Sequence, residues 1–306
     1  MAPSKRTYRL LLAALCCLSL WGCRHDEPAT SHIIVEGWIE AGEHPMVMIH
    51  RSCPYSQIDT SYNSIEDLVE DYLIPFGKVT VSDGDTTVVL TGRINHDYMP
   101  PYTYSSVYIK GEEGKTYYLT AQYGDFYATA QTTIPPRTAF DSIRTGQQPG
   151  NRLSITGYLN RAPARTHYLV FARYMDRKQY LLCPLGVITT PDSVSDMQIN
   201  IYNPAPNDEE KSFDKAFFPC SDSTGIYVKL ATINDEDYAF WDSFSALSLT
   251  SGILFIPIRQ NITSNIHGGI GYWCGMGSTE HYVPLSHPGT YTYPPAASLP
   301  SLSPLP

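Results

Sequence analysis

The feature that most constrains the fold of this chain is a series of short β-branched and aromatic runs separated by turn residues. An Asp-Gly-Asp turn at residues 83–85 joins two of these runs, and Asp-Gly between such runs is a strong hairpin signal. Short strands at regular spacing predict an antiparallel sandwich, here an immunoglobulin-like β-sandwich over residues 32–136, which ends where Pro135 and Pro136 stop the last strand. The predicted strands of this first half are residues 32–39, 45–51, 78–82, 86–90, 105–110, 116–122 and 127–133.

The second half is also rich in β-type runs, and one helix interrupts them near residues 235–249. Asn234 is a good N-cap, and three acidic residues fill the first turn, where carboxylates suit the helix dipole. The aromatic flank of this helix, which includes Phe240 and Trp241, is interpreted as packing on a sheet, with a binding role as the alternative. We expect residues 137–289 to form a second antiparallel β-domain carrying one helix. Its predicted strands are residues 152–158, 167–174, 179–183, 198–202, 226–234 and 253–258.

Two further segments depart from the β pattern. Residues 64–73 predict a short amphipathic helix, because Ser64 can cap its first turn and apolar residues recur on one face. From about Thr290 the composition reduces to Pro, Ala, Ser and Leu, so we expect a disordered tail over residues 290–306.

The first 23 residues predict where the protein works. Three positive residues precede a short apolar run at residues 10–21, and Gly22-Cys23 ends it with a small residue before a cysteine. The run is shorter than the roughly 20 residues of a membrane-spanning helix, so residues 1–22 are interpreted as a cleaved lipoprotein signal peptide. The mature chain is then expected to begin at Cys23, whose lipid anchors it in the outer membrane, with residues 23–31 as a tether.

Two carboxylates, Asp26 and Glu27, follow the expected lipid-bearing residue almost directly. They are similar to the acidic export tag that sends Bacteroidetes lipoproteins to the outer face of the outer membrane. On this interpretation the protein faces the cell exterior, and a solvated polar tether is the alternative.

Net charge excludes one class of partner. Removal of residues 1–22 takes away three positive charges, so the formal net charge moves from −9 to −12 in the mature chain. Binding to nucleic acids depends on Lys and Arg side chains that neutralise phosphates, whereas carboxylates are in excess here. We expect no nucleic-acid partner.

Four cysteines follow Cys23, and none belongs to a CxxC motif of the kind that binds metal or performs redox chemistry. An oxidising compartment permits disulfides, and Cys183 with Cys220 is the preferred pair because both fall in the second predicted domain. Free buried thiols remain an open alternative at this point.

The most distinctive segment of the mature chain is residues 261–273 (NITSNIHGGIGYW), which leads into a glycine-rich run. No Gly-Lys-Ser/Thr follows and no helix begins there, so neither a P-loop nor a dinucleotide fingerprint is present. Glycines that let the backbone turn or lie close against a sheet explain the run. The alternative is a loop approached by a small ligand or a partner, with candidate residues Asn265, His267, Gly268, Gly269 and Gly271.

No other motif indicates catalysis or a cofactor. The Gly-x-Ser-x-Gly nucleophile elbow of α/β-hydrolases is absent, and the spacings of His267, His281 and His287 match no metal-ligand pattern. A carboxylate pair for glycoside hydrolysis is defined by its separation in space, which a sequence does not give. We expect a non-enzymatic protein without metal or cofactor, and keep a hydrolase with dispersed catalytic residues as a minor alternative.

Six short motifs follow one another along the mature chain: residues 34–39 (IVEGWI), 81–84 (VSDG), 114–119 (GKTYYL), 128–130 (ATA), 134–136 (IPP) and 264–271 (SNIHGGIG). In this order and spacing they resemble an uncharacterised lipoprotein family of Bacteroidetes, domain of unknown function 4249. Residues 272–275 (YWCG) and the Pro-rich tail depart from the family pattern. The resemblance implies an accessory surface lipoprotein of a TonB-dependent receptor in nutrient uptake, with an unknown small ligand. A structural or adhesive surface lipoprotein is the alternative.

Overall fold

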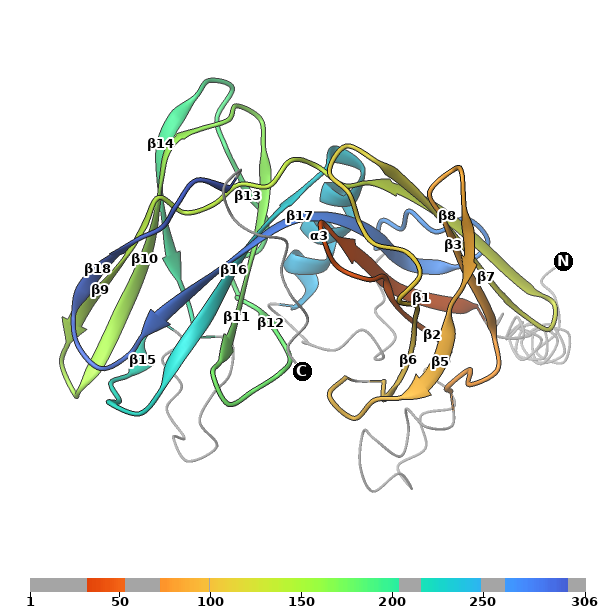
Figure 1. The fold of residues 1–306 in the computed structure, drawn as a ribbon, viewed down its shortest axis with the longest axis horizontal. Coiled ribbons are helices and arrows are strands. Elements are labelled where there is room, and N and C mark those ends of the chain that lie inside the picture. The colour runs from red at the N-terminus through yellow and green to blue at the C-terminus, as the bar shows by residue number, and fades with distance from the viewer. Residues whose placement is uncertain (1–31, 53–71, 99, 204–215, 249–261, 297–306) are drawn as a thin grey trace, which may run out of the picture. The chain divides into compact units, whose positions relative to one another are not determined.

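The computed structural model describes residues 32–52, 72–98, 100–203, 216–248 and 262–296. These residues form a mostly β fold that contains a single α-helix within the described ranges, as predicted (Figure 1). Cys23, Asp26 and Glu27, the predicted strand at 253–258 and most of the predicted helix at 64–73 lie outside the described residues. Within these ranges, no helix is both long and apolar enough to cross a membrane.

Three sheets organise the strands. The largest has nine strands, in the order β12 (Leu181–Leu182), β11 (His167–Tyr174), β16 (Gly225–Ile233), β17 (Ile270–Pro284), β1 (Ile33–Glu40), β2 (Met46–Arg51), β6 (Tyr102–Ser105) and β5 (Thr91–Ile94), with β13 (Ile188–Thr189) beside β11. The second has the order β14 (Ser195–Ile201), β10 (Arg152–Ala162), β9 (Ser142–Gln148) and β18 (Gly289–Thr292), with β15 (Phe218–Pro219) beside β10. The third has the order β4 (Thr87–Val89), β3 (Lys78–Ser82), β7 (Thr116–Tyr123) and β8 (Phe126–Thr133).

Strand β17 connects the two halves of the chain within the largest sheet (Figure 1). Its residues 270–276 pair in parallel with β1, and its residues 277–284 pair antiparallel with β16. The two predicted β-domains, which meet at residue 136, therefore share this nine-stranded sheet. Sequence analysis did not foresee this, because parallel pairing between the first strand and a strand near the end of the chain leaves no local pattern.

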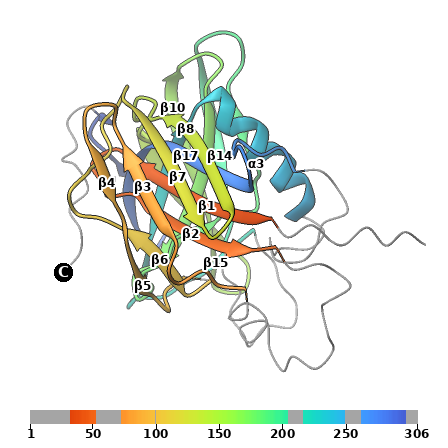
Figure 2. The same ribbon diagram turned by 90° about the vertical axis from the view of Figure 1, so that its right-hand side faces the viewer.

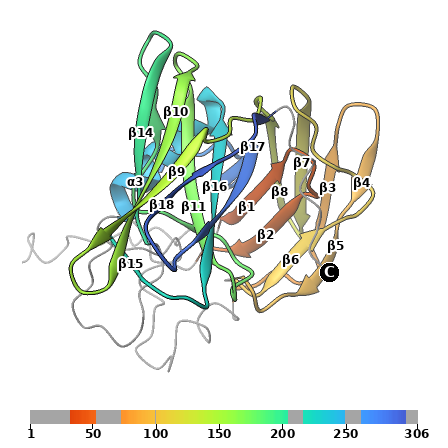
Figure 3. The same ribbon diagram turned by 60° about the vertical axis from the view of Figure 1, so that its left-hand side comes forward.

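Two hydrophobic cores lie on one face of the nine-stranded sheet. Val35 and Ile39 of β1 and Trp273 of β17 are buried in the core beneath the four-stranded sheet. Further along β17, Val283 belongs to the core beneath the five-stranded sheet. Figure 2 shows the four-stranded sheet in front of β1 and β2, and Figure 3 shows the five-stranded sheet beside β16 and β17. Alternate residues of a strand share a face, so both smaller sheets cover the same side of the large one. The first of these layers agrees with the predicted sandwich, whose finer immunoglobulin-like topology stays a prediction.

The opposite face of the large sheet carries the helix, α3 (Asp235–Ser248). Tyr272 and Met276 of β17 point to this side and form a third cluster with Phe240 of the helix. The helix begins as predicted, because the backbone N–H of Asp237 donates to Asn234 Oδ1 at 2.8 Å, which is an N-cap contact.

The glycines of β17 permit close crossings by neighbouring backbone. At Gly271, where φ is +122°, a Cβ would lie 1.9 Å from the carbonyl oxygen of Val35. At Gly277 a Cβ would lie 2.4 Å from the carbonyl oxygen of Pro135, in the segment that follows β8. The interpretation of the glycine run as close contact against a sheet is confirmed, and from Ile270 onward the run belongs to a 15-residue strand.

Two predictions about strands are wrong in detail. The predicted strand at residues 105–110 is displaced, because β6 ends at Ser105. Residues 290–292, predicted as part of the disordered tail, belong to β18, which pairs with β9. Tyr291 and Tyr293 pack against the core of the second half. Their alternation with Thr is a strand pattern that the Pro-rich composition around it concealed.

Replacement of Gly271 by Ala is expected to lower the free energy of unfolding by roughly 3–5 kcal/mol, because the new Cβ meets the Val35 carbonyl and an L residue is strained at this φ. Chemical denaturation of the mature chain measures this loss. Gly114→Ala is the matched control, since Gly114 has φ of +78° and nothing within 4 Å of a Cβ. Backbone strain alone should cost this control about 1–2 kcal/mol, and equal losses in the two variants would contradict the close-contact explanation.

Candidate functional site

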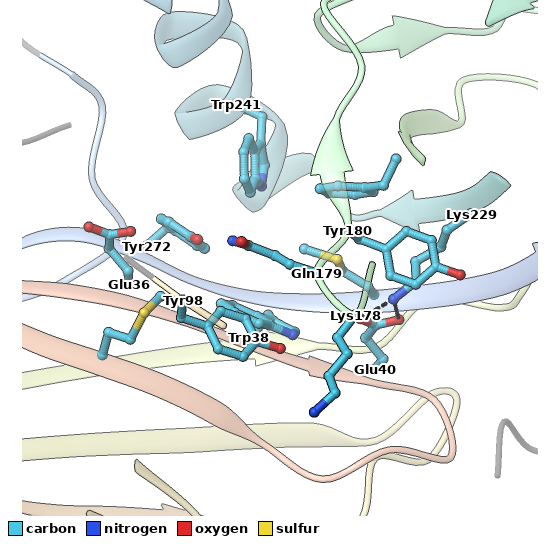
Figure 4. A pocket seen from close by; sticks show the side chains of 13 residues that line it. Glu36, Trp38, Glu40, Tyr98, Lys178, Gln179, Tyr180, Lys229, Trp241 and Tyr272 are labelled. Carbon is cyan, nitrogen blue, oxygen red and sulfur yellow. Dashed lines mark hydrogen bonds and ion pairs between the residues drawn. The ribbon is translucent and has the colours of Figure 1, made fainter. Parts of the chain in front are cut away.

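A pocket of about 210 Å³ opens on the helix side of the nine-stranded sheet (Figure 4). Both halves of the chain contribute to it, through β1 and β2 from the first and through β11, β16, β17 and α3 from the second. We call it the aromatic pocket. Its lining residues are Glu36, Trp38, Glu40, Met48, Tyr98, Phe171, Lys178, Gln179, Tyr180, Lys229, Trp241, Tyr272 and Met276.

The two-residue period of the strands aims these side chains at the pocket. In β1 the odd-numbered residues are buried in the core beneath the four-stranded sheet, so Glu36, Trp38 and Glu40 share the opposite face. The parallel register places Tyr272 of β17 beside Glu36 and Met276 beside Glu40. The pairing of β1 with β17 therefore builds the floor of the pocket.

Aromatic rings surround the pocket and form no single flat surface. The rings of Trp38 and Tyr98 are 5.9 Å apart at an interplanar angle of 43°, and those of Trp241 and Tyr272 are 5.0 Å apart at 56°. Phe171 meets Trp241 edge-on at 6.5 Å. In Figure 4, Trp241 extends from α3 toward the strands below it. Tilted and edge-on contacts are favourable for aromatic pairs, so packing between the rings holds the walls in place.

One end of the aromatic pocket holds a buried ion pair. Lys229 Nζ on β16 donates to both carboxylate oxygens of Glu40 on β1, at 2.8 and 2.9 Å. The two side chains are 11% and 9% exposed. The same Nζ lies 4.2 Å from the centroid of the Tyr180 ring. A carboxylate and an aromatic face thus hold this ammonium group together, and the pair joins the two halves of the chain.

A second cationic group, the Arg173 guanidinium, lies 5.0 Å from the centroid of the Tyr180 ring. The Tyr180 hydroxyl donates a hydrogen bond to Glu280 Oε2, and Arg173 Nη2 lies 3.7 Å from the same oxygen. Burial and the Glu280 carboxylate raise the pKa of Tyr180 far above its ordinary value. The hydroxyl therefore stays protonated and acts as a donor at neutral pH.

The other end of the aromatic pocket holds Glu36, opposite the Glu40–Lys229 pair in Figure 4. Its carboxylate is nearly buried, and His50 Nε2 lies 3.1 Å from Oε1. An ionised carboxylate can only accept, so the imidazole donates in this contact. Among the residues that the structure describes, no Lys or Arg lies within ion-pair distance of Glu36.

Asp237, in the first turn of α3, is buried and joins three other segments. Thr132 Oγ1 and the backbone N–H of Gly275 donate to Asp237 Oδ2 at 2.9 and 3.2 Å, and Asn265 Nδ2 donates to Oδ1 at 3.0 Å. Burial raises the pKa of Asp237 to about 7, although the hydrogen bonds from Thr132 and Gly275 favour the charged form. This carboxyl fixes α3, and with it Trp241, against the sheet.

The predicted ligand loop supplies structural contacts. Asn265 Oδ1 accepts from the backbone N–H of Trp273 at 3.0 Å, and Asn265 Nδ2 donates to the Trp273 carbonyl at 2.8 Å. His267 pairs through its backbone with Thr129 of β8. Asn265 and His267 also line a separate hollow of about 580 Å³ along β7 and β8, which shares no lining residue with the aromatic pocket.

The predicted loop glycines lie where another backbone passes close by. A Cβ on Gly268 would lie 2.2 Å from the carbonyl oxygen of Tyr127, and one on Gly269 would lie 2.8 Å from that of Ile33. Together with the crossing at Gly271, these contacts give the three glycines a packing role. None of them lines the aromatic pocket.

The preferred disulfide between Cys183 and Cys220 is wrong, because both residues are free thiols. Cys183 is buried in the core of the second half, and burial raises its pKa to about 12. Cys220 Sγ lies 3.3 Å from the carbonyl oxygen of Ser286. The structure therefore agrees with the alternative of free thiols.

The three nearby histidines occupy different environments. His281 is buried, accepts a hydrogen bond through Nε2 from the Phe140 N–H at 3.2 Å, and has a pKa that burial lowers to about 4. His287 Nδ1 contacts the Ser286 hydroxyl at 2.8 Å, and His267 is exposed. Across the described ranges, no three His, Cys, Asp or Glu side chains gather as metal ligands.

Sequence analysis did not identify the residues of the aromatic pocket as a site. One signal was present in β1, where Glu36, Trp38 and Glu40 alternate with apolar residues. This pattern places two carboxylates on one face of a buried strand, and buried charges need partners. Lys229 and Tyr272 carry no comparable local signal, because only the sheet brings them to β1.

Most of this fold matches a known family. The profile described as Domain of unknown function (DUF4249) matches residues 25–281, which include every residue that lines the aromatic pocket. The chain belongs to the DUF4249 family. A comparison with curated proteins gives no match. The DUF4249 match crosses residue 136, so the family unit spans both halves, as the nine-stranded sheet does.

Replacement of Lys229 by Ala in this DUF4249 protein is expected to cost about 3–5 kcal/mol of stability, because it leaves the buried Glu40 carboxylate without its partner. The double variant Glu40→Gln/Lys229→Met should lose less, since no lone charge remains. Denaturation curves measure both. Arg165→Ala, in an ion pair with exposed Asp192, is the control and should change stability by about 1 kcal/mol or less. If Lys229→Ala lost no more stability than this control, the buried ion pair would not have the stabilising role assigned to it.

The raised pKa of Asp237 predicts that the stability of the protein depends on pH. The folded pKa of Asp237, about 7, lies above the ordinary value of 3.8, so the folded state binds the proton more tightly. Its contribution is therefore complete below about pH 4 and is lost as the pH rises toward 7, at up to about 1.4 kcal/mol per pH unit. The Asp237→Asn variant should lack this slope. Denaturation of both proteins at successive pH values across the window measures the difference.

The comparison between these two proteins matters because His281 has the opposite effect. Burial lowers the pKa of His281 to about 4, so its contribution to stability rises with pH in an overlapping window. Both proteins contain His281, so this contribution cancels when the stability profile of one is subtracted from that of the other. Asp192→Asn, at an exposed carboxylate, is the control and should keep the wild-type slope. Parallel pH profiles for wild type and Asp237→Asn would refute the assignment.

Proposed function

We propose that this DUF4249 protein is a non-enzymatic, ligand-binding lipoprotein of the outer membrane, exposed at the cell surface. In this proposal it is anchored by lipid on Cys23 and serves as the accessory partner of a TonB-dependent receptor in nutrient uptake. The aromatic pocket carries the proposal. Aromatic walls with a few fixed polar groups are typical of small-molecule sites.

Several properties of the aromatic pocket support a binding role. Its walls come from two sheet segments and a helix whose position is fixed by the buried Asp237. The walls hold charged groups at both ends, which a pocket formed by imperfect packing would not need. A site with pre-positioned groups loses little entropy when a ligand enters, so it can bind without a conformational change.

The spacing of the two pocket carboxylates argues against the hydrolase alternative. Glu36 and Glu40 point to the same face of one extended strand, four residues apart, which separates their Cα atoms by roughly 13 Å. Figure 4 shows their carboxylates at opposite ends of the pocket. Glycosidase carboxylates lie within about 5–10 Å of each other. Glu40 is moreover held at both oxygens by Lys229. This arrangement suits recognition better than acid–base catalysis.

The receptor partnership is supported by the family resemblance and by the expected placement of the chain. A lipid at Cys23 and the acidic residues Asp26 and Glu27 would hold the protein at the surface where such receptors open. The structural or adhesive alternative gives no reason for a pocket with buried charges.

Affinity capture of the lipidated protein from detergent-solubilised outer membranes tests this proposal. The expected result is a TonB-dependent receptor recovered in stoichiometric amount and identified by mass spectrometry. The control is an unrelated outer-membrane lipoprotein that carries the same affinity tag and is captured in parallel. Recovery of the protein alone, or of the same receptors with the control, would refute the partnership.

A further inference from the structure

We infer that the aromatic pocket binds an organic cation, a small molecule whose ammonium group lies at the Glu36 end between the carboxylate and the aromatic rings. This inference rests on the proposed function in one respect, namely that the pocket takes a small ligand. It adds the chemical class of that ligand.

The first support is a cation that the protein itself places in this pocket. The Lys229 ammonium group at the opposite end contacts the Glu40 carboxylate at 2.8 and 2.9 Å and the face of Tyr180 at 4.2 Å. A carboxylate and an aromatic face are the two groups that together stabilise a desolvated ammonium ion. The pocket surface is thus suited to such a cation at one of its ends.

The second support is that the Glu36 end offers the same pair of groups. Tyr272 is the direct neighbour of Glu36 in the parallel register, and its ring packs at 5.0 Å from that of Trp241. His50 occupies Oε1 of Glu36, and within the described part of the chain neither Lys nor Arg pairs with this carboxylate. An ammonium group beside Glu36 would therefore complete the arrangement that Lys229 completes at the other end.

The third support is the arrangement of charges and rings around the pocket. The Lys229 ammonium is already held by Glu40, and the exposed Lys178 pairs with Asp97 at 3.6 Å, so Glu36 is the charged group that is left for a ligand. A sugar typically stacks on a flat aromatic platform. The rings here are tilted at 43° and 56° to their neighbours and surround the space, which suits a compact cation.

The test is isothermal titration of the full mature chain with cationic and neutral probes of equal shape. Choline is compared with 3,3-dimethylbutan-1-ol, in which carbon replaces the charged nitrogen, and cadaverine and agmatine extend the cationic set. Glucose, galactose and N-acetylglucosamine represent the sugar alternative. Choline is expected to bind at least about tenfold more tightly than its neutral isostere.

Two pocket variants separate the role of charge from that of shape. Glu36→Gln keeps the side-chain shape and should weaken choline binding at least about tenfold, with the neutral isostere unaffected. Trp38→Leu keeps the carboxylate and should weaken choline through the loss of an aromatic face. Glu113→Gln, at a carboxylate paired with Arg137 outside the pocket, is the matched control and should bind as wild type does. Thermal unfolding of each variant checks that it is folded.

The outcomes distinguish this inference from the proposed function. Equal binding of choline and its isostere, tighter binding of a sugar, or an unchanged affinity in a folded Glu36→Gln variant would overturn the cation and leave the pocket as a binding site. If no probe of either class binds, the inference is overturned as well. Receptor capture is measured separately, so its result stands or falls independently of these titrations.

Discussion

The parallel pairing of β1 with β17 is the constraint on which the rest of the structure depends. It unites strands from the two ends of the chain in one sheet, and two smaller sheets then cover a single face of that sheet. The other face is left for α3 and the aromatic pocket. Without this pairing, the Glu36 and Glu40 side chains of β1 would have no Tyr272, Met276 or Lys229 beside them.

The pocket also shows how the protein tolerates charge in its interior. An isolated buried carboxylate is costly, and the structure gives each one a partner of different chemistry. Glu40 has an ammonium group, Glu36 an imidazole, and Asp237 a set of hydroxyl and amide donors together with a raised pKa. The partners of Glu40 and Asp237 lie far away in the sequence, so these two charges also specify which segments meet. Buried polar groups have this effect in some other proteins, at some cost in stability.

Much of the fold could be predicted because its signals are local. Alternating β-branched residues located most strands. Asn234 and the three acidic residues after it predicted a helix at residues 235–249, which differs from the observed α3 by one residue at its C-terminal end. What sequence could not supply was the pairing of distant strands. The glycines of β17 were therefore understood as close contacts but not as part of a strand, and the family membership, carried by short motifs, said nothing about where the pocket lies.

The candidate site shows the same difference between what local motifs indicate and what only the assembled sheet shows. Residues proposed from a conspicuous motif, such as Asn265 and Gly271, proved to hold the sheet together. The pocket residues come from ordinary strands, and their shared purpose appears only once the sheet assembles them. A Glu-x-Trp-x-Glu pattern within an otherwise buried strand was the one local clue, and it gains meaning from the cost of burying two carboxylates.

The same long-range pairing sets the order in which the protein can fold. Strand β1 is the first of the described strands to be synthesised, but one of its edges stays unpaired until β17, near the end of the described chain, has followed. Contacts so distant in sequence slow folding, and open edges invite pairing with other chains. A partly synthesised chain therefore exposes an open strand edge, and premature arrest of synthesis would leave an aggregation-prone fragment rather than a smaller working protein.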